Sequence, residues 1–464
     1  MSKKYQITAD LFTLPYKEDS AILYAPRVGF ACAANVDLIN LLADLEMQDF
    51  DSLNDEQIAA LDYLDQKGLV NGSPEVSVIP IFPEKFSPTE LTLFPTNQCN
   101  LRCRYCYASA GDWKPKVMDW HYAVSAIECV IENLKQRNMQ TLSLGFHGGG
   151  EPLYPWEFIK RTITYAEERC AQEGLQLMAF SATNGVLSQR QLEWIVKHFV
   201  NLNISFDGLP EAQNYHRPLI SGKGSFEFVD RTLRFLDERQ FNYGIRGTIS
   251  SFNVDRMEDI IDFIGQNYQV KMVHLEPIFY CGRCKTNNIL SPEMQKFADN
   301  FRNCEQKALA YNIALTYSGC HLEHLRGSFC GVATDSFSIT PDGDITGCYE
   351  ITSNDDPKSE TFFIGRIQED GRLEIDEKKR AYLHSLTVDN LEFCRDCFAK
   401  WHCAGECAAK LDHTDYTGAR GNERCVLNRD LIRSRLINLI EGKPYRPNFE
   451  SNGTGQKTAD NKTC

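Results

Sequence analysis

The stretch CNLRCRYC, from Cys99 to Cys106, places three cysteines in a short loop directly after the apolar run Leu91 to Phe94. An apolar run of this length is typical of a buried strand, so the thiols are expected where a strand ends. A structural zinc site takes four protein ligands, and the loop offers no fourth cysteine or histidine. Three thiolates on a four-iron cluster leave one iron open to another ligand. The loop therefore predicts an iron–sulfur site with a free coordination position.

The composition is that of an ordinary globular protein. The chain has 464 residues, 42% of them hydrophobic and 24% charged, enough for two or three domains. It has no apolar run of membrane-spanning length and no signal-peptide core at its N-terminus, so we expect a cytoplasmic protein without a membrane partner. The net charge of −14 argues against general nucleic-acid binding. Eighteen cysteines without an export signal indicate metal or redox chemistry rather than disulfides.

Residues 1–85 are predicted to form a small N-terminal unit. Ala21–Tyr24 is a candidate strand, and residues 36–45 and 58–67 carry apolar side chains at helical spacing. Leu69-Val70, which follows a glycine helix stop, is expected to return as a strand. The pattern resembles a winged-helix module of the kind that peptide-modifying enzymes use as a RiPP recognition element, which binds the leader of a precursor peptide as an added strand. The alternative is an N-terminal cap without a ligand.

From residue 91 onward, strands and helices alternate. Strands are expected at residues 91–94, 141–146, 175–181, 202–206, 243–249 and 271–276, and helices at 119–136, 156–172, 189–198, 226–238 and 255–266. This alternation predicts an α/β fold with a parallel sheet and right-handed crossovers. Six strands favour a partial (β/α)6 barrel of the TIM type over residues 88–318. Chemistry in such folds lies at the carboxyl ends of the strands.

A polar motif follows each of the first four expected strands. The cysteine loop follows the first, FHGGGEP (146–152) the second, SATNG (181–185) the third, and SFDG (205–208) the fourth, with His216-Arg217 shortly after. The glycines allow close approach of the backbone to a ligand, and the carboxylate of the second motif offers an acceptor to an ammonium group. Each motif is weak evidence alone, but their order after successive strands is specific.

The spacing CxxxCxxC with an aromatic residue before the last cysteine resembles the radical S-adenosylmethionine (SAM) superfamily. The resemblance implies that Cys99, Cys103 and Cys106 hold a [4Fe-4S] cluster whose open iron binds the amino and carboxylate groups of SAM. It implies further SAM-site residues, which are Tyr105, Gly149, Gly150, Glu151, Pro152, Ser181, Asn184, Ser205 and Arg217. Among these, the GGEP segment is expected at the SAM amino group and Arg217 at its carboxylate.

A cysteine-rich segment is expected over residues 319–440. Its cysteines are Cys330, Cys348, Cys394, Cys397, Cys403, Cys407 and Cys425. This seven-cysteine spacing resembles the SPASM domain, which carries two auxiliary [4Fe-4S] clusters. By this resemblance, the outer cluster takes Cys394, Cys397, Cys403 and Cys425, whereas the inner cluster takes Cys330, Cys348 and Cys407, with Cys320 as the candidate fourth ligand. Without Cys320, the inner cluster has an open iron. The alternative is a pair of structural zinc sites.

The resemblance implies an enzyme in which a reduced cluster splits SAM, and the resulting 5′-deoxyadenosyl radical abstracts hydrogen from a C–H bond. A reductant such as flavodoxin or ferredoxin would feed the first cluster, and the auxiliary clusters would accept a second electron or fix the substrate. Because substrates in the family are commonly peptides or proteins, we predict a maturase that crosslinks or otherwise oxidises a precursor peptide. Alternatives are a formylglycine-generating sulfatase maturase, a radical SAM enzyme with a small-molecule substrate, and an iron–sulfur carrier without a substrate.

One departure bears on these alternatives. Anaerobic sulfatase maturases carry an aspartate base directly after the cysteine that matches Cys348, whereas this chain has Tyr349-Glu350. The missing aspartate argues against the sulfatase-maturase alternative. Tyr349 and Glu350 are therefore candidate catalytic residues, and a structural role is the alternative for each. Cys281 and Cys284 are expected to be free thiols in a loop. The polar residues 441–464 are expected to form a disordered tail.

Overall fold

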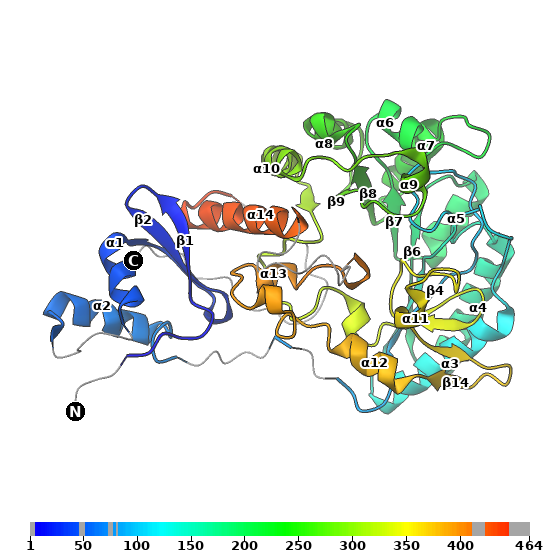
Figure 1. Ribbon diagram of the computed structural model, residues 1–464. Helices are drawn as coiled ribbons and strands as arrows, with labels where there is room; N and C mark the ends of the chain where they lie inside the picture. The colour runs from blue at the N-terminus through cyan, green and yellow to red at the C-terminus, as the bar shows by residue number, and fades with distance from the viewer. Residues whose placement is uncertain (1–4, 46–51, 73–77, 80–81, 411–422, 445–464) are drawn as a thin grey trace.

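The computed structural model describes residues 5–45, 52–72, 78–79, 82–410 and 423–444 and contains two sheets (Figure 1). The larger sheet has eleven strands in the order β10-β9-β8-β7-β6-β5-β4-β11-β12-β13-β14, and the smaller has the order β1-β2-β3. In Figure 1 the small sheet lies at one end of the molecule, and the large sheet lies with its helices at the other.

The central part of the large sheet is parallel, as predicted. It comprises β4 (Glu90–Leu93), β5 (Thr141–Phe146), β6 (Gln176–Thr183), β7 (Asn201–Ser205), β8 (Tyr243–Ile249) and β9 (Met272–Pro277). A further parallel strand, β10 (Ala314–Thr316), pairs with β9 and was not predicted. The described strands form an open sheet that does not close into a barrel, and its mostly parallel pairing agrees with the predicted α/β fold.

The two faces of these strands carry different side chains. Tyr243 and Ile245 of β8 and Leu275 of β9 are buried in the main hydrophobic core, whereas the alternating Arg246 and His274 point to the opposite, interior face. The helices that cover the core are α3 (Trp120–Gln136), α4 (Trp156–Glu173), α5 (Gln189–His198), α6 (Pro210–His216), α7 (Phe226–Glu238), α8 (Met257–Asn267) and α10 (Met294–Ala310). Helices α3, α4, α5, α7 and α8 lie within a few residues of a predicted helix.

The cysteine-rich segment extends the same sheet. Strand β11 (Ser338–Ile339) pairs in parallel with β4, and antiparallel pairing adds β12 (Asp344–Thr346), β13 (Phe363–Ile367) and β14 (Leu373–Ile375). Its helices are α11 (Ser359–Phe362), α12 (Glu377–His384), α13 (Lys400–Cys403) and α14 (Glu423–Ile440). The proposed boundary after residue 318 therefore separates sequence motifs but does not divide the sheet.

The N-terminal unit contains β1 (Phe12–Lys17), β2 (Ser20–Ala25), β3 (Phe30–Asn35), α1 (Val36–Ala43) and α2 (Asp55–Gln66). The sequence predicted β2 and both helices but missed β1 and β3. The predicted return strand was wrong, because Val70 forms only an isolated bridge with Ile7. The unit has its own apolar core, yet Tyr24 hydrogen-bonds His402, so the small sheet also packs on the cysteine-rich segment.

Short 3-10 segments lie at Pro26–Val28, Val254–Arg256, Gly331–Thr334, Glu392–Cys394 and Ala408–Lys410. Of the predicted disordered tail, residues 441–444 are described, whereas residues 445–464 lie outside the described part of the chain. Among the helices that the structure describes, none has the length and apolar character needed to cross a membrane.

A short helix after β9, α9 (Arg283–Asn287), docks on the cysteine loop. Arg283 Nη1 donates to the carbonyl of Cys103 at 2.9 Å, and Nη2 donates to that of Ala110 at 2.7 Å. Gly282 has φ +50°, and a Cβ there would lie 2.3 Å from the carbonyl oxygen of Cys106. Cys281 and Cys284 are free thiols, as predicted, but the segment is partly helical rather than a loop. The charged side chain of Arg283 holds the cysteine loop by its backbone.

We expect Arg283→Gln to loosen the cysteine loop. The shorter, neutral side chain loses charge-assisted bonds to two buried carbonyls, so amide exchange over residues 103–112 should accelerate roughly ten- to a hundredfold. Hydrogen–deuterium exchange mass spectrometry measures this directly. Lys285→Gln, on the exposed face of the same helix, is the matched control. Unchanged exchange in Arg283→Gln would show that these bonds are not needed.

Candidate functional site

The three thiols of the cysteine loop lie close enough to interact electrostatically. The charges of Cys103 and Cys106 contribute to raising the pKa of Cys99, although burial is the largest cause. Burial likewise raises the pKa of Cys103 to about 12. The N–H groups of Leu101 and Ala110 donate to the sulfurs of Cys99 and Cys106, each at 3.4 Å. Such donors stabilise thiolate ligands and tune the potential of a cluster that they hold.

Tyr105 fixes the loop from its other side. Its Oη donates to Asp207 Oδ2 at 2.6 Å, and Asp207 also pairs with Arg217 Nη2 at 3.1 Å and His216 Nδ1 at 3.2 Å. The Arg217 and His216 partners lower the pKa of the fully buried Asp207 carboxyl despite its burial. Arg217, expected at the SAM carboxylate, is thus engaged by Asp207, which the sequence analysis did not single out. Its Nε has no hydrogen-bond partner among the described residues.

The GGEP segment packs directly on the chain that enters the cysteine loop. The Glu151 N–H donates to the carbonyl of Gln98 at 2.8 Å, and a Cβ on Gly150 would lie 2.3 Å from that same oxygen. A Cβ on Gly149 would lie 2.6 Å from Thr352 Oγ1. Pro152 is buried. The glycines therefore bring the glutamate against the cysteine loop, as their placement after β5 predicted.

Glu151 is a buried carboxylate without an ion-pair partner among the described residues. Only 4% of it is exposed. It accepts hydrogen bonds from Thr183 Oγ1 and the Asn184 N–H, both at 2.7 Å, and from the Leu153 N–H at 3.1 Å. Burial raises its pKa to about 7, against these bonds, which favour the ionised form. Within the described part of the chain it forms no ion pair, so an ammonium group of a ligand would complete its environment.

The remaining expected SAM-site residues are placed differently from one another. Asn184 Nδ2 donates to Asn100 Oδ1 at 2.7 Å and contacts Cys99 Sγ at 3.6 Å, so it joins the third motif to the cysteine loop. Ser205 is half-buried on the interior face of β7. Ser181 is fully buried on the helix-covered face, and its Oγ donates to the carbonyl of Phe146 at 3.1 Å.

These residues fit the two groups that the resemblance implies. Three neighbouring thiols with N–H donors match the ligand set of a [4Fe-4S] cluster with one open iron. The unpaired carboxylate of Glu151, held against the same loop, matches the SAM ammonium. Cys99, Cys103 and Cys106 would hold the cluster, and Glu151 would hold SAM beside it.

The C-terminal cysteines gather in two groups. Cys397 and Cys425 act electrostatically on Cys394, and Cys394 and Cys397 act on Cys403, so the four expected outer ligands lie together. Cys330 and Cys348 act on Cys407, which groups the three expected inner ligands. Among the described residues, no three His, Cys, Asp or Glu side chains converge as a single metal ion requires. A four-iron cluster takes one cysteine per iron, so its ligands are spread more widely.

Most of the charged neighbours of Cys320 differ from those of the three inner cysteines. The charges that act most on it are those of Arg435, Glu305, Glu323 and Arg326, and none of the three inner cysteines is among them. It is buried in the main hydrophobic core. From its burial in the apolar core and these charged neighbours we propose that three cysteines hold the inner cluster.

Tyr349 and Glu350 occupy the edge of the inner group. Tyr349 Oη bonds Thr92 Oγ1 at 3.0 Å, and its ring lies 4.8 Å from that of His147, so it packs across the ends of β4 and β5. The charge of Glu350 acts on each of the three inner cysteines, and its carboxylate pairs with Lys410 at 2.8 Å. Glu350, rather than Tyr349, is the acidic group beside the inner cysteines.

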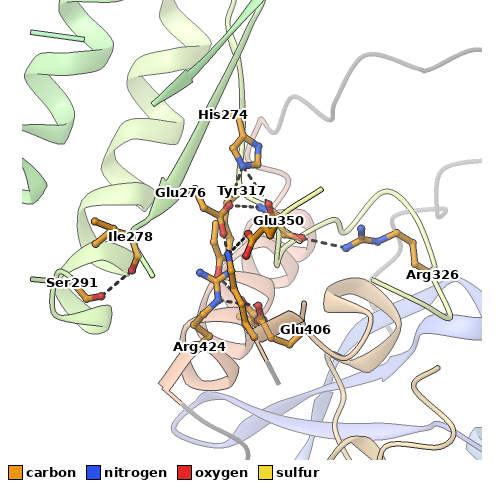
Figure 2. Close-up of polar contacts among 12 residues, drawn as sticks. His274, Glu276, Ile278, Ser291, Tyr317, Arg326, Glu350, Glu406 and Arg424 are labelled. Carbon is orange, nitrogen blue, oxygen red and sulfur yellow. Dashed lines mark hydrogen bonds and ion pairs between the residues drawn. The ribbon is translucent and has the colours of Figure 1, made fainter. Parts of the chain in front are cut away.

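A buried polar cluster that the sequence did not reveal lies beside Glu350 (Figure 2). Glu276, at the end of β9, pairs with Arg424 Nη2 at 2.7 Å and with His274 Nε2 at 2.9 Å. Arg424 Nε also donates to Glu406 at 3.0 Å. The cluster fastens α14 to the carboxyl end of the parallel sheet. No sequence pattern joins these residues, because Glu276 and Arg424 are 148 positions apart.

We expect Cys320→Ser to retain all iron, whereas Cys407→Ser should lose about four irons per chain, because only Cys407 lies in a cluster group. Iron analysis and electron paramagnetic resonance of the reconstituted protein measure both. Thermal unfolding controls for the buried position of Cys320. Loss of cluster signal in Cys320→Ser with an unchanged unfolding temperature would make it the fourth ligand.

Comparison with known proteins shows what the chain is similar to. Residues 93–264 match the Radical SAM superfamily. The chain is 25% identical over 344 residues to the radical SAM cyclopropyl synthase TigE of Paramaledivibacter caminithermalis, covering 69% of this chain and 68% of that protein. It is 22% identical over 375 residues to the serine-type anaerobic sulfatase-maturating enzyme of Klebsiella aerogenes, covering 75% of this chain and 85% of that one.

Among solved structures, native anSMEcpe with bound AdoMet and Cp18Cys peptide superposes with a TM-score of 0.60. The match covers 76% of this chain and all of that one at 18% identity, which is a likeness of fold. The predicted α/β fold and the predicted superfamily are confirmed. We conclude that residues 93–264 form a domain of the Radical SAM superfamily.

Proposed function

We propose that the chain is a peptide maturase that oxidises a side-chain carbon of a precursor peptide, forming a crosslink or another oxidative modification. The observation that carries this proposal is the position of Tyr107, between the two cysteine systems. Burial raises the pKa of the Tyr107 hydroxyl, and the charges of Cys106, Glu350 and Cys348 raise it further. The Tyr107 Oη donates to the carbonyl of Tyr349 at 3.4 Å. Hydrogen abstraction at the cysteine loop and removal of the second electron at the inner cysteines would thus take place on the same interior face of the sheet.

The residues of the chain would divide the work as follows. When bound, the cluster and SAM supply a 5′-deoxyadenosyl radical, which takes a hydrogen atom from an unactivated C–H bond. Glu151 binds the SAM ammonium, Asn184 and Ser205 line the same ligand, and Tyr105 with Asp207 orients the cysteine loop. The auxiliary clusters would be held by the two C-terminal cysteine groups, and a flavodoxin or ferredoxin in the cytoplasm would supply the reductant.

Glu350 is the candidate proton acceptor of this site. It lies beside the inner cysteines, with Lys410 at 2.8 Å. A carboxylate here could take the proton that a substrate carbon or heteroatom loses as the second electron leaves. Tyr349 would position the substrate rather than react, because its hydroxyl is bonded to Thr92.

The N-terminal sheet supports a peptide as the substrate. Strand β2 lies between β1 and β3, so β1 and β3 are the two outer strands of this sheet. The pairing of β1 with β2 is interrupted by a register shift after Pro15, whereas β3 pairs with β2 along its whole length. An uninterrupted strand at the end of a sheet can accept a peptide as an additional strand. A leader bound at β3 would hold the precursor on the enzyme. The anSMEcpe structure, which contains a bound peptide, and the sulfatase-maturating relative support a polypeptide substrate.

A formylglycine-generating activity on a sulfatase is the second candidate. The sulfatase-maturating relative favours it, and Glu350 supplies a carboxylate two residues after Cys348, one position beyond the place of the maturase aspartate. A serine or cysteine of the substrate would then be oxidised instead of crosslinked.

The deciding experiment is anaerobic incubation of the reconstituted enzyme with SAM, reductant and short peptides encoded beside the gene, followed by mass spectrometry. We expect one peptide to lose a pair of hydrogens as 5′-deoxyadenosine is released in step. A peptide truncated at its N-terminal half should lose modification while SAM cleavage persists. Release of 5′-deoxyadenosine with every peptide unaltered would refute the maturase proposal. Conversion of a sulfatase peptide to an aldehyde would establish the second candidate.

SAM affinity should depend on pH through Glu151. Its pKa, raised by burial to about 7, leaves the carboxyl protonated at lower pH, and a proton there competes with the SAM ammonium. Between about pH 8 and pH 6 the affinity of the loaded enzyme should fall roughly tenfold. Glu151→Gln should bind SAM at least about tenfold more weakly at the higher pH and show a flat profile. Equilibrium dialysis measures both. A profile in Glu151→Gln that still falls with pH would assign the dependence elsewhere.

A further inference from the structure

Four polar side chains form one row across the interior face of the sheet. The strand register pairs Ser205 of β7 with Arg246 of β8, Arg246 with His274 of β9, and His274 with Thr316 of β10. His274 Nδ1 bonds Thr316 Oγ1 at 2.9 Å. The row therefore runs from a predicted SAM-site residue to the buried cluster of Figure 2, and Arg246 stands in its middle.

Arg246 is the permanently charged member of this row. Its side chain is exposed to the interior, and it forms no hydrogen bond or ion pair with any described residue. The neighbouring carboxylates are occupied elsewhere. Glu276 is bound by Arg424 and His274, Asp207 by Arg217 and Tyr105, and Glu350 by Lys410. A guanidinium carries five N–H donors, so this arrangement leaves a complete donor set directed at the interior.

The charge of Arg246 reaches both sides of the interior. It acts on His274 and Glu276 on the adjacent strand, and on Tyr107 and His147 at the strands opposite. Burial, followed by the charge of Arg246, lowers the pKa of His147 to about 4. The surrounding imidazoles are thus held neutral. Glu276 interacts with the guanidinium only through its charge, because no described carboxylate forms an ion pair with Arg246.

We infer that Arg246 binds a carboxylate of the substrate, either an Asp or Glu side chain or a chain terminus, and so fixes the peptide beside the SAM site. This inference deepens the proposed function and rests on it. A guanidinium binds a carboxylate through two parallel hydrogen bonds, which fix orientation as well as position. A substrate group held in the row between Ser205 and His274 would lie close to SAM on one side and to Glu350 on the other. The carboxylate of SAM itself is the other source of the same chemistry.

The test uses full-length reconstituted enzyme with SAM and two probes, N-acetylglutamate N-methylamide and its glutamine analogue. Saturation-transfer NMR should show that the wild type prefers the glutamate probe by about tenfold or more. Arg246→Gln should abolish the preference, Arg246→Lys should retain part of it, and Arg190→Gln, on the exposed surface of α5, should retain all of it. SAM affinity should stay within about twofold in every variant.

Three results would overturn the inference. These are the absence of a glutamate preference in the wild type, persistence of the preference in Arg246→Gln, and a SAM affinity that falls about tenfold in Arg246→Gln. The last would assign the guanidinium to the SAM carboxylate. Because the probes report binding without turnover, an Arg246-dependent preference together with unmodified peptides would support the carboxylate site and refute only the peptide maturase.

Discussion

The parallel pairing of β4 to β10 is the constraint on which the site depends. Parallel pairing brings the carboxyl ends of all these strands to one edge, and alternation along each strand sends apolar side chains to the helices and polar ones to the interior. The cysteine loop, Glu151, Ser205 and Arg246 therefore meet although they are far apart in the chain. A shift of one residue in register would exchange the two faces and bury Arg246 in the apolar core.

The cysteine loop lies at this carboxyl edge of the sheet, where neighbouring segments hold it largely through contacts with its backbone. Glycines at 150 and 282 allow other segments to approach within hydrogen-bonding distance of the cysteine loop, and Arg283 and Asp207 supply the charged contacts. Side chains that hold the loop in this way leave its thiols free for a cluster. The buried carboxylate of Glu151 is the complement, because it is supported by N–H and O–H donors and has no ion-pair partner among the described residues.

The sequence predicted what local pattern can encode. Alternating apolar runs gave the six parallel strands and most covering helices, and the motifs after those strands gave the cysteine loop, Glu151 and Asn184. It could not predict short strands such as β11, because two residues carry no periodicity, nor α9, whose stability comes from contacts with the cysteine loop. Arg217 was identified by its motif, but its pairing with Asp207 depends on tertiary packing. Glu276 and Arg424 are joined only by the fold, because 148 positions of sequence separate them.

The pairing of β11 with β4 has a consequence for folding order. Strand β4 carries the cysteine loop and begins the parallel sheet, yet its outer neighbour lies about 245 residues later in the chain. During synthesis the core can assemble from β4 onward, but its first strand keeps an exposed edge until residue 339 has emerged, which makes the nascent core prone to wrong pairing. Contacts of such long sequence separation form slowly. Synthesis of the cysteine-rich segment is therefore the step that covers the exposed edge of β4, the strand that carries the cysteine loop.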